Sequence, residues 1–225
     1  MGSVWTIVVA AGSASRFGRP KQYQPLGDRR VLDWSLRSAR AVSSGVVLVV
    51  PAEHVDDDEP LADHVVSGDA TRSGSVRAGL AAVPPDADVI LVHDGARPLA
   101  PPDLFADVLA HVRGGAAAVV PAVPVTDTVR SRTNGVIDRA DLVMVQTPQG
   151  FRAATLRAAH DAGGAEGTDD ASLVEANGGA VVLSPGRPTN LKITYPTDLL
   201  VAEALLPGVV VDDVPAASAG SDPAR

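Results

Sequence analysis

Lysine is rare in this chain, which makes its two lysines candidates for a special role. Of the 19 basic residues only Lys21 and Lys192 are lysines, and the others are arginines. A lysine ammonium is a compact charge that fits a tight phosphate site where the wide guanidinium of arginine does not. Lys21 and Arg16 adjoin a loop of small residues, 10–15, whose main-chain N–H groups could bind phosphate oxygens. These residues predict a phosphate site; the alternative is a tight strand-to-helix turn with solvated basic side chains.

A carboxylate stands at the end of another apolar stretch. Residues 88–92 are typical of a buried strand, and they lead into His93 and Asp94. Mg²⁺ typically takes one or two carboxylates together with substrate phosphates, so a carboxylate beside a phosphate loop is a natural ligand for it. We therefore expect Asp94 to hold Mg²⁺, with helix capping in the next turn as the alternative. His93 is expected to pack or to form hydrogen bonds and not to bind the metal.

Composition excludes several other chemistries. The chain has no cysteine, which rules out disulfides, thiolate catalysis and zinc sites with cysteine ligands. The dinucleotide fingerprint fails because Ala14 holds its second glycine position, and the Gly-Lys-Ser/Thr tripeptide of the P-loop is missing. A formal charge of -8 argues against a nucleic-acid surface. With no signal peptide or membrane-spanning apolar run, we expect a cytoplasmic protein that does not contact membranes.

Apolar runs alternate with helical patterns along most of the chain. The runs predict strands over residues 4–9, 46–50, 64–67, 88–92, 116–120 and 180–183. The patterns predict helices over residues 31–42, 71–83, 102–112, 151–162, 169–176 and 197–206. This alternation is typical of an α/β fold whose mostly parallel sheet is covered by helices on both faces. Ligands bind outside the carboxyl ends of such strands, so the small-residue loop, Gly68-Asp69 and Asp94 should line one crevice.

The segment 123–145 has a different character. Polar and β-branched residues alternate around Thr133-Asn134-Gly135, and Asn-Gly is a strong signal for a two-residue hairpin turn. We expect a projecting β-hairpin arm, and because a lone hairpin is marginal in water, it should pack against something. The main domain is assigned to residues 1–206. Residues 207–225, rich in Pro, Ala, Ser, Gly and Asp, are predicted to form a flexible tail.

Six short motifs, taken together, resemble a known enzyme family. In chain order they are Ala10-Ala11-Gly12 with Arg16, Pro20-Lys21-Gln22-Tyr23, His93-Asp94-Gly95-Ala96-Arg97-Pro98, Thr147-Pro148-Gln149, Thr168-Asp169-Asp170-Ala171-Ser172 and Asn190-Leu191-Lys192-Ile193-Thr194. Over about residues 4–206 the chain is similar to the 2-C-methyl-D-erythritol 4-phosphate cytidylyltransferases of non-mevalonate isoprenoid synthesis. The resemblance implies a Rossmann-like nucleotidyltransferase sheet that binds CTP and Mg²⁺. It also implies that a sugar-alcohol phosphate attacks the α-phosphorus of CTP and displaces pyrophosphate.

The resemblance assigns roles to single residues as well. It implies that Arg16 and Lys21 stabilise the transition state, and that Lys192 contacts the reacting phosphates. The cytidine site would be formed by Ala10, Ala11, Gly12, Gly68, Asp69 and Ser75. The acceptor site would be formed by Asp94, Arg97, Thr128, Arg139 and Thr168, with Asp94 also holding the metal. In this family the arm embraces a second subunit, so a homodimer is implied in which Arg139 reaches the partner's crevice as a catalytic residue.

Three positions depart from the family pattern. Ala14 stands where a second glycine is usual, Phe17 replaces a Met and Gly95 replaces an Ala, and none of these carries a charged role. Two other functions stay open: the same transfer to a pentitol phosphate, and a non-catalytic nucleotide-binding module that keeps the fold. The acceptor residues named above favour methylerythritol phosphate. The intact set of charged residues argues against the binding module.

Overall fold

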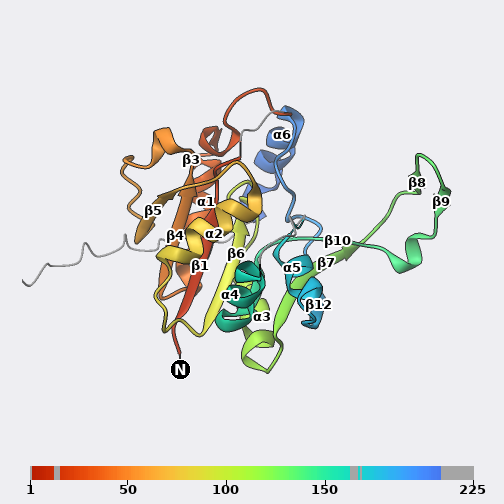
Figure 1. Ribbon diagram of the computed structural model, residues 1–225. Coiled ribbons are helices and arrows are strands. Elements are labelled where there is room, and N and C mark those ends of the chain that lie inside the picture. Colours follow the sequence, from red (N-terminus) through yellow and green to blue (C-terminus); the bar gives the residue numbers. More distant parts are fainter. Residues whose placement is uncertain (1, 13–15, 163–166, 168, 209–225) are drawn as a thin grey trace, which may run out of the picture.

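A computed structural model of the chain describes residues 2–12, 16–162, 167 and 169–208, and a single eight-stranded sheet forms its centre (Figure 1). The strands are β1 (Val4–Val9), β4 (Gly45–Val50), β5 (His64–Ser67), β6 (Val89–Asp94), β7 (Ala118–Pro124), β10 (Val143–Val145), β11 (Gln149–Arg152) and β12 (Val181–Pro185). In space they follow the order β5-β4-β1-β6-β11-β7-β12. Strand β10 also pairs with β7, and it follows β11 along the length of that strand. All of them except β10 and β11 run in the same direction, so the sheet is mostly parallel, as predicted.

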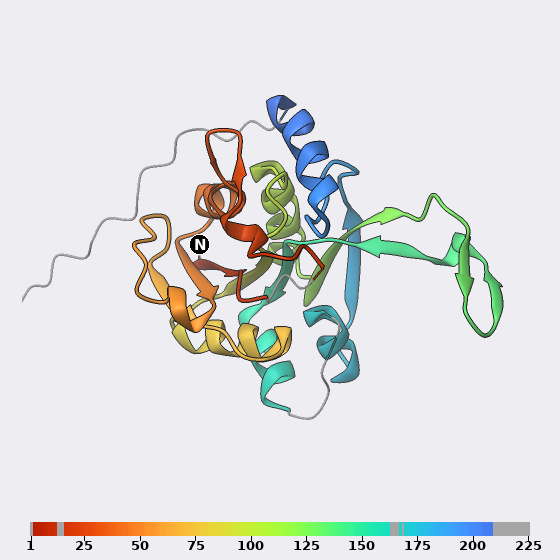
Figure 2. The ribbon, with the colours of Figure 1, turned by 90° about the horizontal axis from the view of Figure 1, so that it is seen from above.

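Helices cover both faces of the sheet (Figure 2). One face carries α1 (Val31–Val42) and α3 (Pro102–Arg113), whose buried leucines pack against β4 and β6. The other face carries α2 (Arg72–Ala82), which packs on β1 and β4, and α4 (Ala153–Asp161), which packs on β6 and β11. It also carries α5 (Asp170–Ala176), which packs on β7 and β12. Every residue of β4 and β6 is buried, because a parallel strand between two helical layers has no side exposed to water. The continuous apolar runs in the sequence follow from this arrangement.

The helix predicted over residues 151–162 is wrong at its start. Residues 149–152 form β11, which lies antiparallel between β6 and β7, and the helix begins only at Ala153. Gly150 permits this because a Cβ there would lie 2.5 Å from Cγ1 of Val108 on α3. The strand is thus held by close packing beneath a helix. The four residues of the segment, one of them glycine, show no local pattern that predicts a strand.

The predicted arm exists and projects far from the rest of the chain (Figures 1 and 2). Its tip is a hairpin of β8 (Val129–Ser131) and β9 (Gly135–Ile137), in which Ser131 pairs with Gly135. The predicted two-residue turn is therefore wrong, since residues 132–134 form the loop and Gly135 adopts a left-handed φ of 80°. The Ser131 hydroxyl accepts the N–H groups of Thr133 and Asn134, which favours this longer turn.

The end of the described chain folds back beside the start of the sheet. Helix α6 (Pro196–Leu205) packs on the small hairpin of β2 (Pro25–Leu26) and β3 (Arg29–Arg30) through a third apolar cluster that includes Trp34. Of the predicted tail, residues 207–208 belong to a short 3-10 turn and residues 209–225 lie outside the described residues. None of the described helices is long and apolar enough to cross a membrane.

Candidate active site

A cavity of about 450 Å³ opens at the carboxyl ends of β1, β5 and β6. Four parts of the chain line it: the loop after β1, the start of α2, the end of β6 and the segment before α6. Its polar lining consists of Arg16, Lys21, Gln22, Asp69, Thr71, Arg72, Ser75, Asp94, Lys192 and Thr194. Both lysines of the chain therefore line one cavity, although most of the sequence separates them.

Small residues let two loops approach each other at the edge of this cavity. A Cβ on Gly68 would lie 2.3 Å from Cβ of Ala11 and 2.9 Å from Oγ of Ser75, so only glycine fits there. The Ser75 hydroxyl accepts the N–H of Asp69 at 3.1 Å and donates to the carbonyl oxygen of Thr71 at 2.9 Å. Gly68 is thus a packing position behind the lining, while Ser75 fixes the loop that carries Asp69.

Lys21 begins a short 3-10 helix, and the next residue anchors it. Gln22 is buried, and its Nε2 donates to the carbonyl oxygen of Ala10 at 2.7 Å. This bond ties Lys21 to the small-residue loop, so the ammonium and the loop face the same volume. Burial, followed by the positive charge of Lys192, lowers the pKa of Lys21, while Asp94 opposes the shift. The two lysines repel each other, and a bound anion would relieve that repulsion.

Three cations surround the carboxylate of Asp94, which ends β6. Its Oδ2 accepts from Nζ of Lys192 at 2.7 Å and lies 3.9 Å from Nε of Arg97. Its Oδ1 accepts from Nε of Arg72 at 3.4 Å. Burial would raise the pKa of Asp94, but Lys192, Arg72 and Arg97 outweigh burial and hold the pKa well below its usual range. The carboxylate is therefore ionised at neutral pH.

A buried asparagine positions the loop that carries Lys192. Asn190 is fully buried, and its Nδ2 donates to the carbonyl oxygen of Thr147 at 2.9 Å. The main-chain carbonyl oxygen of Asn190 accepts from Nη1 of Arg97 at 2.7 Å. Arg97 therefore links the loop of Lys192 to Asp94, and the asparagine of this sequence motif serves the geometry of the loop.

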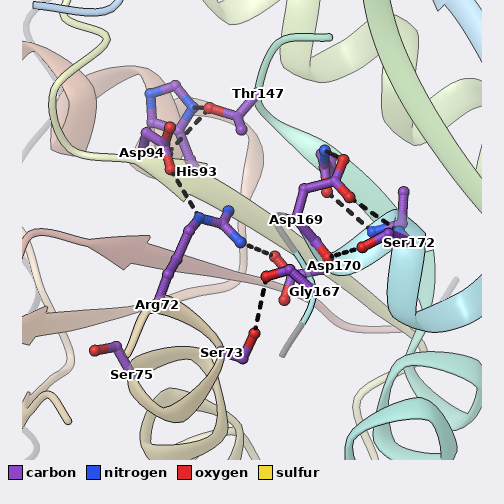
Figure 3. Close-up of polar contacts among 12 residues, drawn as sticks. Arg72, Ser73, Ser75, His93, Asp94, Thr147, Gly167, Asp169, Asp170 and Ser172 are labelled. Atoms are coloured by element: carbon purple, nitrogen blue, oxygen red, sulfur yellow. Dashed lines mark hydrogen bonds and ion pairs between the residues drawn. The ribbon is translucent and has the colours of Figure 1, made fainter. Parts of the chain in front are cut away.

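Arg72 lines the cavity, yet no sequence motif singled it out. It is the first residue of α2, directly after the N-cap residue Thr71. Its guanidinium faces Asp94 and donates from Nη1 to Oδ2 of Asp170 at 2.6 Å (Figure 3). The only signal in the sequence was its place at the start of a predicted helix, because a pairing with a residue so distant leaves no local pattern.

The structure brings most of the predicted site residues to the cavity. Those that line it are Ala10, Ala11, Gly12, Arg16, Lys21, Asp69, Ser75, Asp94 and Lys192. Arg97 lies next to it through Asp94. Thr128 and Arg139 belong to the arm and do not line this cavity, and Arg139 donates to the carbonyl oxygen of Thr126. Thr168 lies outside the described residues. Beyond Arg72, the lining residues Gln22 and Thr194 had no predicted role.

The donor set fits Mg²⁺ only if a ligand supplies most of the coordination. Among the described residues, no group of three or more His, Cys, Asp or Glu side chains could hold a metal ion. Mg²⁺ commonly binds through one or two carboxylates plus substrate phosphates and water, so a single carboxylate is no obstacle. Asp94 offers that carboxylate, and its Oδ1 has a longer contact (3.4 Å) than its Oδ2 (2.7 Å). The residues present fit a metal shared with a polyphosphate.

His93 is buried beneath this carboxylate. Oγ1 of Thr147 accepts the N–H of Asp94 at 3.0 Å, so its hydroxyl proton is free to be donated to Nδ1 of His93 at 3.1 Å. The ring of His93 packs on Phe105, with 4.8 Å between the centroids. Burial lowers the pKa of His93 to about 3. The side chain is a neutral packing and hydrogen-bonding residue, as the sequence suggested.

A mostly parallel sheet with a cation-lined cavity at its carboxyl edge is typical of an α/β protein that binds a phosphorylated ligand there. The sequence profile of IspD, 2-C-methyl-D-erythritol 4-phosphate cytidylyltransferase, matches residues 4–207. The chain therefore belongs to the 2-C-methyl-D-erythritol 4-phosphate cytidylyltransferase family.

Individual relatives agree with the family match. The 2-C-methyl-D-erythritol 4-phosphate cytidylyltransferase of Rhodococcus opacus (strain B4) is 44% identical over 219 residues, which cover 91% of this chain and 96% of that protein. The bifunctional enzyme IspD/IspF of Clavibacter michiganensis subsp. michiganensis is 45% identical, and the match covers 96% of this chain but 56% of that protein. The crystal structure of the cytidylyltransferase from Thermus thermophilus matches with a TM-score of 0.77 at 36% identity, covering 89% of this chain and 98% of that one.

We expect His93 to make the protein less stable as the pH falls. Its pKa is below that of the unfolded chain, about 6.5, so the unfolded chain takes up the proton first. Stability that is present above about pH 6.5 is lost as the pH falls toward 3, and this group accounts for about 2 kcal/mol at pH 5. Urea unfolding at pH 7 and pH 5 measures the loss, which should shrink in His93→Asn. His111→Asn, at an exposed helical position, is the control. An unchanged loss in His93→Asn would contradict the buried neutral imidazole.

Proposed function

We propose that this chain transfers the cytidylyl group of CTP to the phosphate of 2-C-methyl-D-erythritol 4-phosphate, giving 4-diphosphocytidyl-2-C-methyl-D-erythritol and pyrophosphate for isoprenoid biosynthesis. The observation that carries the proposal is the convergence of Arg16, Lys21, Asp94 and Lys192 on one cavity in a chain of this family. Both substrates are soluble phosphate esters, and we place the reaction in the cytoplasm, with no role for nucleic acid or membrane.

The reaction is one phosphorus–oxygen exchange. An oxygen of the acceptor phosphate bonds to the α-phosphorus of CTP while the bond from that phosphorus to the bridging oxygen breaks, and the electron pair leaves with pyrophosphate. The attacking oxygen is ionised at neutral pH, so no general base is needed. Catalysis then consists of holding two anions against their repulsion and stabilising the charge that develops. Arg16, Lys21 and Lys192 line the cavity and would supply the positive charge that this requires.

We assign the nucleoside end of CTP to the small-residue wall of the cavity. Ala10, Ala11 and Gly12 leave room for a base and sugar, and the main-chain groups of Ala11 and Gly12 would form specific hydrogen bonds, because those of Ala10 are bonded to Val49 and Gln22. Asp69 also lines the cavity, on the adjoining loop that Ser75 holds, with Gly68 behind it. In this assignment, the shape of the cavity wall and its main-chain groups select the nucleoside, while charged side chains bind the phosphates.

We propose that Asp94 holds Mg²⁺ together with the CTP phosphates. When bound, the ion would neutralise charge on the triphosphate and help the pyrophosphate to leave. Asp94 is ionised and fixed at the end of β6, so it could bind the metal ion without any rearrangement of the strand. Lys192, which donates to Asp94 at 2.7 Å, would then be shared between this carboxylate and the reacting phosphates.

We propose a homodimer that completes the acceptor site. The arm exposes apolar side chains to water, with Val136 62%, Met144 49% and Val143 44% exposed, and a partner subunit would cover them. Thr128 and Arg139 belong to this arm and do not line the cavity of their own chain. Arg139 would therefore reach the partner's cavity and bind the acceptor there together with the partner's Arg97 and Thr168.

Two other functions remain as alternatives that experiment separates. The same chemistry on a pentitol phosphate would need only a different acceptor pocket. A non-catalytic nucleotide-binding module would keep the cavity but would not need the cations that surround Asp94, which are Arg72, Arg97 and Lys192.

Incubation with CTP, Mg²⁺ and one acceptor at a time tests the proposed function. Pyrophosphate should appear with 2-C-methyl-D-erythritol 4-phosphate, much more slowly with ribitol 5-phosphate, and not with CTP alone. Chelation of the metal by EDTA should abolish the reaction, and excess Mg²⁺ should restore it. Faster turnover of the pentitol phosphate would support the first alternative, and no pyrophosphate with either acceptor would support the binding module.

The two lysines should not tolerate arginine. Lys21→Arg and Lys192→Arg retain the charge, but the wide guanidinium would misplace the phosphates, and a small misplacement can lower turnover about a hundredfold. Steady-state kinetics measures the effect, with thermal unfolding to show that the fold is intact. Arg113→Lys, at an exposed helix end, is the reverse control and should leave turnover unchanged. Near-normal turnover in either lysine variant would mean that charge alone matters there.

Subunit exchange tests whether sites are completed between chains. Lys21→Ala and Arg139→Glu should each be inactive alone, because each removes one essential cation from every site. A mixed dimer has one site with both residues intact and one site that lacks both. Random exchange should therefore restore about a quarter of wild-type activity. If mixed dimers form and stay inactive, Arg139 serves its own chain.

A further inference from the structure

Arg72 joins two carboxylates that come from distant parts of the chain. Its Nε donates to Oδ1 of Asp94 at 3.4 Å, and its Nη1 donates to Oδ2 of Asp170 at 2.6 Å (Figure 3). The shorter contact is the one away from the reaction, because Asp170 is fully buried at the start of α5 and does not line the cavity. Arg72 is therefore held from behind and presents its other side to Asp94.

Asp170 is itself firmly held. Its Oδ1 lies 3.0 Å from Nε2 of His160 on α4, so both of its oxygens are engaged. The preceding residue, Asp169, caps α5 by accepting the N–H of Ser172 at 2.9 Å, and its other oxygen accepts from Gln149 at 2.7 Å. The anchor is thus bonded to α4, α5 and β11 and not only to Arg72.

A buried carboxylate requires a positive partner, and Arg72 satisfies that need for Asp170. Arg72 is not fully enclosed together with this carboxylate. Arg72 instead keeps 24% of its side chain exposed and lines the cavity, while the Asp170 side chain is 0% exposed. The pair is therefore arranged to bring a fixed positive charge to the floor of the cavity.

We propose that Arg72 is a positioning residue for Asp94, fixed by Asp170 and His160. This inference rests on the proposed function, in which Lys192 is shared with the reacting phosphates. Lys192 would then divide its contacts between Asp94 and the phosphates, whereas Arg72 would keep its contact with Asp94 because it is anchored on Asp170, which does not line the cavity. Arg72 thereby fixes the orientation in which the Asp94 carboxylate would bind the metal–nucleotide complex.

A charge-balanced double variant separates positioning from simple structural pairing. Arg72→Gln with Asp170→Asn replaces the ion pair by two amides that can hydrogen-bond, so neither partner is left as a buried, unpaired charge. The fold should remain, judged by thermal unfolding. Residues that orient a metal ligand typically change metal affinity or activity by about 10–100-fold when they are lost. We expect a fall of that size in kcat and a similar rise in the Mg²⁺ concentration for half-maximal activity.

A second readout does not depend on catalysis. Titration calorimetry gives the Kd of CTP with and without Mg²⁺. The ratio of the two Kd values measures how much Mg²⁺ strengthens CTP binding, and therefore how well Asp94 is placed to bind the metal. We expect that ratio to shrink by about tenfold in the double variant. Arg72→Lys, which can contact only one of the two carboxylates, should fall between the double variant and wild type.

Arg157→Gln is the matched control. Arg157 also links two helices on this face, but within the described part of the chain its hydrogen bonds go to the backbone carbonyl oxygens of Leu80, Val83 and Pro84, and it does not line the cavity. It should lower the midpoint of thermal unfolding without changing the Mg²⁺ effect on CTP binding. A double variant with wild-type kcat and an unchanged calorimetric ratio would overturn the positioning role. If wild type forms no pyrophosphate, the proposed function fails, and the calorimetric ratio still decides the role of Arg72.

Discussion

The site depends on the neutralisation of one buried carboxylate. Asp94 is fixed by the sheet, and an ionised carboxylate in such a place is costly unless cations and hydrogen bonds compensate it. The compensating groups come from three separate segments: Arg72 from the start of α2, Arg97 from the turn after β6 and Lys192 from the loop before α6. The buried, ionised form of Asp94 is therefore favourable only when all three segments are in place. The site is assembled by the same step that folds these segments.

The same arrangement gives the protein local positive charge against its overall charge of -8. Lys21 is half-buried, and its pKa is lowered first by burial and then by the charge of Lys192. The free cavity thus holds cations that repel one another, and Asp94 opposes that repulsion. A polyphosphate that enters the cavity gains from relieving it, because the side chains need little rearrangement to meet the anion. The protein is acidic overall, which favours anion binding at this cavity over the rest of the surface.

The sequence revealed the parts of the fold that local pattern controls. Strands β4 and β6 were predictable because burial on both faces demands unbroken apolar runs. Strand β11 was not, since its four residues are defined by contacts with β6, β7 and α3. In the site, motifs located Lys21, Asp94 and Lys192. The Arg72–Asp170 pair spans 98 residues and has no local signature.

Polar contacts between distant segments connect the site to the rest of the chain. The arm returns through β10 to Gln146, whose Oε1 accepts from Nδ2 of Asn190 at 3.3 Å. Asn190 is bonded in turn to Arg97, which lies beside Asp94. From the other direction, α5 reaches Asp94 through Arg72. Two chains of polar contacts therefore end on the same carboxylate, one from the root of the arm and one from the helical layer that contains α5. Rigid connections of this kind explain why a cavity lined mainly by loops can hold its charged groups in fixed positions.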